Sequence, residues 1–167
     1  MKSSRKNTKL KTTRTKVKLV MLFRPLTIKD KDAIGRILNS RAQSPLVGVS
    51  WTLDTILAEL KGTSYIFGTQ RVEGGPLEAF VLFKDLGAVI EILLIYSDKN
   101  ARGAGQRLIE ALKTANPQIE EIWLEVHEGN LPAIRFYERQ GFVNVSRRSN
   151  YYPDGKAALN YNLTLKR

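Results

Sequence analysis

A carboxylate and a phenol lie twelve residues apart in the C-terminal half of the chain. Glu125 stands in the strand-like apolar run 122–126, and Tyr137 stands in a short helical segment that we expect Asn130 to cap. A carboxylate can accept a proton and a phenol can donate one, so the pair could act as general base and general acid. Such a pair suits an amine substrate, because a protonated amine must lose its proton before it can attack an electrophile.

A glycine turn, Gly103-Ala104-Gly105, follows an apolar strand-like run and opens an amphipathic helix. The first N–H groups of a helix lack intrahelical acceptors and its dipole is positive there, so phosphate groups bind readily at this end. Glycine also lets a ligand approach the backbone closely. By itself, such a turn is equally typical of a tight connection between a strand and a helix. Together with a base and an acid, it indicates an enzyme that holds a phosphate-bearing cofactor.

These candidates also have plainer interpretations. A glutamate at a strand end is often solvated or ion-paired, and Tyr137 beside Phe136 could be core packing. His127, the single histidine, lies two residues beyond Glu125 and thus on the same strand face, and we favour a structural or rim role for it. Four further residues either line a substrate groove or belong to a solvated loop: Arg147, Arg148, Tyr151 and Tyr152.

Composition limits the kind of protein this can be. A chain of 167 residues with 43% hydrophobic content is typical of one compact domain with a real core. The absence of cysteine excludes disulfides and thiolate metal sites and allows a reducing compartment, and a single histidine argues against a histidine metal site. The sequence holds no apolar run of about 18 residues, so we expect no membrane span, no metal and a cytoplasmic location.

Positive charge is concentrated at the N-terminus. The net charge is +11, and residues 1–18 hold eight Lys or Arg and no acid, which leaves 19 basic and 16 acidic side chains in the other 149 residues. We expect a disordered basic tail over 1–18 and a folded domain over 19–167. The tail is open to two interpretations: non-specific contact with RNA or the ribosome, or a leader without a role. A mitochondrial-type transit peptide fits less well, because the tail lacks an apolar face.

Hydrophobic periodicity predicts an α/β order of elements. The run 89–96 is apolar on both faces and should be a central strand. Helices are predicted over 27–38, 52–61, 106–116 and 131–140. Strands are predicted over 20–24, 65–69, 77–83, 89–96, 122–126 and 159–165, and a further strand begins at 142–145. The result is a mixed central sheet of about seven strands flanked by about four helices.

Several motifs resemble the GCN5-related N-acetyltransferase (GNAT) superfamily over about residues 20–165. Segment 98–108 resembles its acetyl-CoA loop, although Asn100 stands where the family prefers Gln or Arg. Segment 123–142, with Glu125, Asn130 and Tyr137, is similar to the C-terminal part of the superfamily. Segment 150–159 looks like the branch of ribosomal-protein-alanine and related N-terminal acetyltransferases. Ser50-Trp51-Thr52 also resembles that branch, with Ser where Pro is usual.

The resemblance implies a GNAT-type sheet with acetyl-CoA held at a splay between two central strands. It implies that Glu125 is the general base and Tyr137 the general acid, and that Asn130 contacts the pantetheine. The pantetheine arm would pair with the backbone of Leu93, Leu94 and Ile95. The pyrophosphate would bind the amides of Ala101, Arg102, Gly103, Ala104, Gly105 and Gln106.

The expected reaction is direct acetyl transfer from acetyl-CoA, without a metal, to a protein N-terminal α-amine, such as that of a ribosomal protein. An α-amine has a pKa of about 7.7–8.0, against about 10.4 for lysine, so a carboxylate deprotonates it more easily. Two alternatives stay open: acetylation of a small-molecule amine or antibiotic, and a non-catalytic RNA- or ribosome-binding module that uses the tail.

Overall fold

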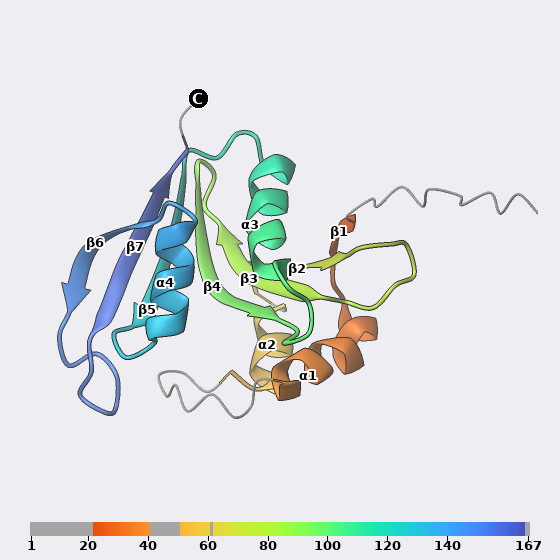
Figure 1. Cartoon of the computed structure of the whole chain (residues 1–167), viewed down its shortest axis with the longest axis horizontal. Coiled ribbons are helices and arrows are strands. Elements are labelled where there is room, and N and C mark those ends of the chain that lie inside the picture. The colour runs from red at the N-terminus through yellow and green to blue at the C-terminus, as the bar shows by residue number, and fades with distance from the viewer. Residues whose placement is uncertain (1–21, 41–50, 61, 166–167) are drawn as a thin grey trace, which may run out of the picture.

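One seven-stranded sheet forms the centre of the part of the chain that the computed structural model describes, residues 22–40, 51–60 and 62–165. Its strand order is β1-β2-β3-β4-β5-β7-β6 (Figure 1). All neighbouring strands are antiparallel except β4 and β5, which are parallel. The strands are β1 (Leu22–Pro25), β2 (Ser64–Gln70), β3 (Ala79–Asp85), β4 (Val89–Ser97), β5 (Glu121–His127), β6 (Val143–Arg148) and β7 (Ala158–Thr164).

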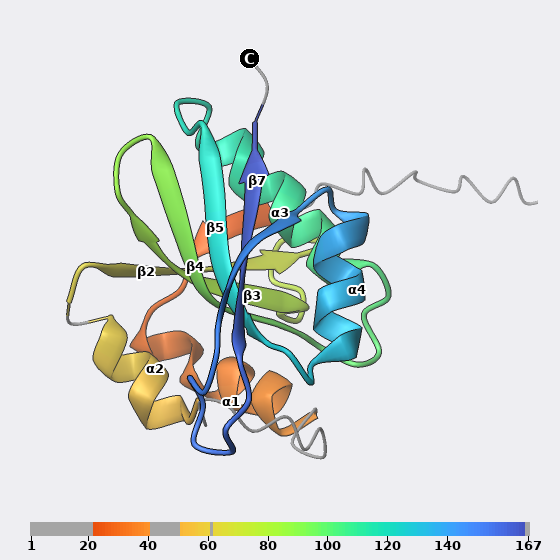
Figure 2. The same cartoon turned by 90° about the vertical axis from the view of Figure 1, so that its left-hand side faces the viewer.

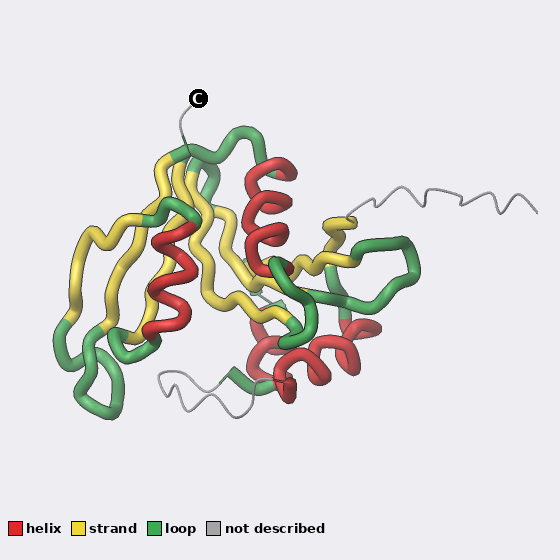
Figure 3. The backbone as a smooth tube through the Cα atoms, viewed as in Figure 1, coloured by secondary structure: helices red, strands yellow, loops and turns green. Residues whose placement is uncertain are grey.

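Helices cover both faces of this sheet (Figures 1 and 2). On one face, α3 (Ala104–Ala115) and α4 (Leu131–Arg139) bury a core that includes Leu108 and Tyr137. On the other, α1 (Lys31–Ser40) and α2 (Leu53–Glu59) close a second core around Ile34 and Ile56. A short 3-10 turn, η1 (Ile28–Asp30), leads into α1. The predicted mixed α/β architecture is confirmed, and Figure 3 shows the helices lying beside the strands of the central sheet.

Local sequence signals explain where the helices begin. Thr27 and Asp30 form a reciprocal capping box at η1, and Thr52 caps α2 by accepting the Thr55 N–H at 3.2 Å. Asn130 accepts the Ala133 N–H at 3.1 Å and so caps α4, as predicted. None of the described helices is long and apolar enough to cross a membrane.

Several boundaries differ from the sequence-based prediction. Helix α2 ends at Glu59 rather than near Gly62, β3 covers 79–85 rather than 77–83, and residues 20–21 of the first predicted strand lie outside the described part. The main correction concerns Arg147 and Arg148, which lie in β6 and not in a loop. The first half of β6, Val143-Asn144-Val145-Ser146, alternates apolar and polar residues as a strand does, whereas its end at Arg147 and Arg148 holds only exposed polar side chains and gives no strand signal.

The two parallel central strands separate part-way along their length. Register between β4 and β5 runs from Val89 opposite Glu121 to Ile92 opposite Leu124 and then ends. Beyond it β4 continues to Ser97 and β5 to His127. On its other edge β4 carries one extra residue against β3, between Ile92 and Leu94, and such a bulge bends a strand. The predicted splay between two central strands is therefore confirmed.

Candidate active site

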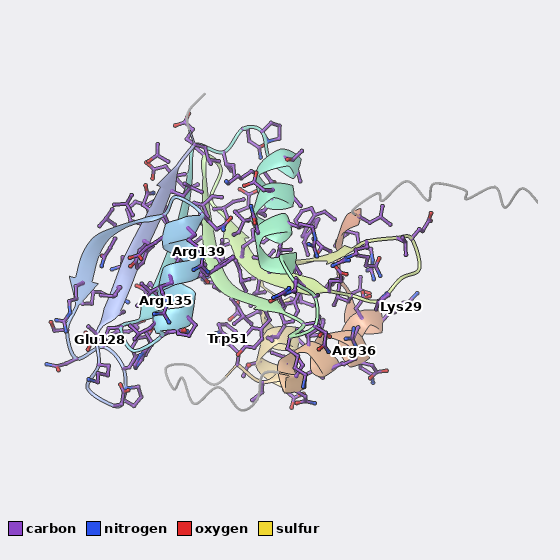
Figure 4. The ribbon with its side chains drawn as sticks, in the orientation of Figure 1. Lys29, Arg36, Trp51, Glu128, Arg135 and Arg139 are labelled. Atoms are coloured by element: carbon purple, nitrogen blue, oxygen red, sulfur yellow. The ribbon has the colours of Figure 1, made fainter. Side chains whose placement is uncertain are left out.

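A cavity of about 1090 Å³ occupies the region where β4 and β5 separate. All twelve residues predicted for the site line it, from segments more than forty residues apart in the chain. Trp51, Glu91 and Arg139 line it as well, although sequence reasoning had not singled them out for the site. Trp51 precedes α2, and Arg139 projects from α4 (Figure 4). Arg147 and Arg148 are not among the lining residues, whereas Tyr151 and Tyr152 are.

The loop before α3 presents several backbone N–H groups to the cavity. Gly103 holds the left-handed backbone conformation, with φ of 71°, and no side chain caps the helix. The Ala101 and Ala104 N–H groups donate to carbonyls of the loop itself, at 3.0 and 3.1 Å. The other four loop amides have no acceptor among the described residues: those of Arg102, Gly103, Gly105 and Gln106. These four N–H groups are available to donate to a ligand, and the predicted phosphate contact of the loop stays a prediction.

Asp98 shapes the start of this loop. One carboxylate oxygen accepts the Asn100 N–H at 2.9 Å, and the other pairs with Arg36 of α1 at 2.6 Å. Arg36 also donates to the Leu77 carbonyl at 2.9 Å. Helix α1, the residues before β3 and the loop are thereby joined into one unit.

Glu78 and Arg107 hold the other end of the loop. The Arg107 guanidinium donates to the Arg102 carbonyl at 2.9 Å and to Glu78 at 2.8 Å. Glu78 also pairs with Arg71 at 2.7 Å, and its side chain is only 14% exposed. Because Arg107 grips the Arg102 carbonyl, the peptide that leads into Gly103 is fixed in orientation. Sequence reasoning missed this group, since its members lie up to 36 positions apart and no spacing signals their contact.

Glu125 lies on the sheet face opposite to α3 and α4. Its neighbours Leu124 and Val126 point into the core with those helices, whereas Glu125 is exposed. An Arg148 guanidinium nitrogen lies 2.6 Å from a Glu125 carboxylate oxygen. The same guanidinium sits 4.0 Å from the centre of the Tyr151 ring. The carboxylate thus faces the cavity while paired with a cation.

Tyr137 is buried in α4 and lines the cavity from the other side. Its ring packs edge-on against Phe136 and Phe142, with centroid distances of 5.3 and 5.6 Å. The hydroxyl has no hydrogen-bond partner among the described residues. Burial raises the pKa of this phenol well above its usual range, so the group is protonated at neutral pH. Tyr137 therefore packs in the core and also lines the cavity, so the structural interpretation and the functional one do not exclude each other.

His127 clamps the turn that follows β5. Its Nδ1 accepts the Gly129 N–H at 2.9 Å, so a neutral ring carries its proton on Nε2, which lies 2.9 Å from Asp154. The ring also packs on Tyr152, with 4.7 Å between centroids. These contacts give His127 the structural role that we favoured.

A family model described as "Acetyltransferase (GNAT) family" matches residues 49–142. The chain belongs to the GNAT acetyltransferase family. It is therefore an acetyltransferase by family, and the resemblance drawn from its motifs is confirmed. The matched GNAT segment includes the splayed strands, the glycine turn, Glu125 and Tyr137.

Two curated relatives are named as N-acetyltransferases. An N-alpha-acetyltransferase of Sulfurisphaera tokodaii is 31% identical over 107 residues, which cover 61% of this chain and 64% of that protein. The [ribosomal protein bS18]-alanine N-acetyltransferase of Escherichia coli K12 is 30% identical over 112 residues, 64% of this chain and 74% of that protein. The match thus spans slightly less than two thirds of the first relative and about three quarters of the second.

Solved structures agree with the GNAT fold. The ribosomal-protein-S18-alanine N-acetyltransferase from Escherichia coli has a TM-score of 0.71 at 24% identity, covering 89% of this chain and 96% of that one. The protein yncA from Salmonella typhimurium, described with its cofactor acetyl-CoA, has a TM-score of 0.65 at 17% identity, with 89% and 95% coverage. At these identities the likeness concerns the fold.

Proposed function

We propose that this GNAT enzyme transfers the acetyl group of acetyl-CoA to the α-amine of a protein N-terminus. The observation that carries the proposal is one cavity in which a protonated phenol, a carboxylate and a phosphate-binding type of loop meet. In the reaction the amine nitrogen forms a bond to the acetyl carbon, the carbon–sulfur bond breaks, the amine loses a proton and the sulfur gains one. A base and an acid on opposite walls suit these two proton transfers.

The residues of the cavity fit acetyl-CoA. Four loop amides without acceptors, at the N-terminus of α3, suit a pyrophosphate, and Lys99, Arg102 and Arg139 add positive charge to the lining. The β4 edge beyond Ile92 has no strand partner on the β5 side, so its backbone groups can pair with an extended arm. Leu93, Leu94 and Ile95 belong to that edge, and Asn130 lines the same cavity. Bound there, acetyl-CoA supplies the acetyl group as a thioester.

Glu125 and Tyr137 would then have distinct tasks. Glu125 is exposed toward the entering amine and accepts its proton, directly or through a water. Tyr137 is held in the protonated state by burial, which is the state that a proton donor to sulfur requires. The same burial makes the phenol a weaker acid, so we expect its contribution to be the smaller of the two.

The names of both curated relatives support an α-amine acceptor, and that of the Escherichia coli relative a ribosomal protein. The lower pKa of an α-amine favours it over lysine for a carboxylate base. We infer a cytoplasmic location, which an acceptor on a ribosomal protein would require. The folded domain would span 19–167, and a contact of residues 1–18 with RNA or the ribosome stays a prediction, since these residues lie outside the described part.

Mass spectrometry after incubation with acetyl-CoA tests the proposal. The acceptors are peptides with a free N-terminus, the same peptides with a blocked N-terminus and a free lysine, and polyamines. We expect acetylation of the free N-termini above all. Acetylation confined to polyamines or to lysine side chains would overturn the proposed acceptor, and no acetylation of any amine would overturn the activity.

A further inference from the structure

The proposed base is not free in this structure. Glu125 pairs with Arg148 at 2.6 Å, and the guanidinium rests on the Tyr151 ring at 4.0 Å. An acceptor ammonium and Arg148 carry the same charge, so they compete for one carboxylate. Binding of the amine to Glu125 therefore requires that Arg148 give up its partner.

The ion pair between Glu125 and Arg148 is weak enough for an incoming amine to displace Arg148. The side chains of Arg148 and Glu125 are 49% and 34% exposed, and an ion pair so open to solvent is weak and screened by salt. The contact with Tyr151 is separate from the contact with Glu125. Arg148 can thus leave the carboxylate and remain on the aromatic ring beside it.

Among the described residues near Arg148, the two carboxylates Glu128 and Asp154 already have partners. Glu128 accepts the Ala157 N–H at 3.0 Å and pairs with Arg147 at 2.8 Å. Asp154 accepts the Lys156 N–H at 3.0 Å and faces His127 at 2.9 Å. The backbone N–H is the largest cause, and the side-chain partner a further one, of a lowered pKa in each of these two carboxyl groups. Both carboxylates therefore stay ionised and bound to their present partners. A displaced guanidinium therefore finds no free counter-charge on Glu128 or Asp154, and a carboxylate of the acceptor could supply one.

An acceptor peptide can bring a carboxylate close to Arg148. An amine on Glu125 lies beside the position that the guanidinium occupies, and each further residue of an extended peptide advances about 3.3–3.6 Å. Side chains of residues 2 and 3 can therefore extend to Arg148. A carboxylate there would restore the lost pairing, whereas a Lys or Arg there would face a like charge.

We propose that Arg148 is a specificity-determining residue that selects acceptor peptides with Asp or Glu at residue 2 or 3. In the exchange, the acceptor's amine takes the place of Arg148 on Glu125, and the acceptor's carboxylate takes the place of Glu125 on Arg148. This inference rests on the proposed function, because it assumes a peptide N-terminus as acceptor.

Arg147 offers a matched control. It is the neighbouring residue of β6, is also an exposed arginine, and stands in register with Leu159, whereas Arg148 stands in register with Ala158. Successive residues of a strand point to opposite faces, and Arg147 pairs with Glu128 instead of Glu125. Arg147→Gln removes one positive charge from β6, as Arg148→Gln does, but leaves the Glu125–Arg148 ion pair intact.

The experiment compares kcat/KM for three peptides that differ only at residue 2, which is Asp, Asn or Lys. We expect the wild-type enzyme to prefer Asp over Lys by about fivefold or more at low salt, mainly through KM, and less at high salt. The preference should vanish in Arg148→Gln, reverse in Arg148→Glu and persist in Arg147→Gln. Thermal melts of each variant check folding.

Two outcomes separate the inference from the proposed function. If wild type acetylates all three peptides with equal kcat/KM, or Arg148→Gln keeps the wild-type preference, the role of Arg148 is wrong and the peptide activity stands. If wild type acetylates none of them, nor any other N-terminal peptide, the proposed function fails and the inference fails with it.

Discussion

At the scale of single residues, the site sets one carboxylate and one phenol in contrasting environments. Glu125 is exposed and paired with a cation, whereas Tyr137 is buried between two aromatic rings. The sheet produces this contrast, since Glu125 points to the open face of β5 while α4 packs Tyr137 into the core. Glu125 is therefore open to protons from an entering substrate, whereas Tyr137 stays protonated and so has a proton to donate.

Burial of the Tyr137 phenol predicts a loss of stability at alkaline pH. Its pKa is raised in the folded protein, while the unfolded chain titrates near 10. The folded state thus binds more protons above pH 10, so the stabilisation is fully present below that pH and is lost as the pH rises further. We expect the wild-type Tm to fall more between pH 9 and 11 than that of Tyr137→Phe. Parallel curves for the two proteins, with Tyr65→Phe as an exposed control, would contradict this.

At the scale of elements, the turn between β4 and α3 depends on a backbone that only glycine adopts easily. A valine at Gly103 would be strained at a φ of 71°, and its Cβ would lie 3.1 Å from an Arg107 nitrogen. Gly87 has a similar φ of 89° in a distant turn with open space around it, so Gly87→Val is the control.

We expect acetyl-CoA to raise the Tm of the wild-type protein and of Gly87→Val but not of Gly103→Val. A ligand that binds only the folded state stabilises it by mass action, by about 2.7 kcal/mol at a hundred times its Kd. An equal shift in all three proteins would show that the turn does not hold the cofactor.

Anchoring of the same loop by Glu78 is a second element-scale prediction. Glu78→Gln weakens the hold on Arg107, which fixes the Arg102 carbonyl. Since a hydrogen bond to a charged group contributes about 1.5–3 kcal/mol, we expect KM for acetyl-CoA to rise about tenfold while kcat changes little. Steady-state kinetics measure both, with Glu110→Gln on the exposed side of α3 as control. A fall in kcat with KM unchanged would speak against a positioning role.

At the scale of the whole molecule, charge divides the chain into two regions. Residues 1–18 carry eight of its 27 basic side chains and no acid. If this segment binds polyanions, its removal should weaken co-sedimentation with ribosomes, most clearly at low salt, and leave peptide acetylation unchanged. If the full-length and truncated proteins co-sediment equally with ribosomes at every salt concentration, residues 1–18 do not bind polyanions. Loss of peptide turnover would instead mean that it belongs to the active domain.

Sequence patterns predicted the parts of the molecule that burial or backbone geometry dictates. The apolar run of β4, the Asn130 cap and the Gly103 turn each carry a local signal, and residues of all three line the cavity. The second half of edge strand β6 carries no such signal, because Ser146, Arg147 and Arg148 are all polar and exposed. The contacts of Glu78 with Arg107 and of Glu125 with Arg148 join distant segments, so only the tertiary fold reveals them.

The rate at which Glu125→Gln acetylates an N-terminal peptide tests the central claim most directly. The substitution keeps the size of the side chain and removes its ability to accept a proton at neutral pH. We predict a fall in kcat of roughly 10²–10⁴-fold, with the acetyl-CoA-induced rise in Tm retained, and a smaller fall in Tyr137→Phe. Acetylation by Glu125→Gln at the wild-type rate would contradict the account.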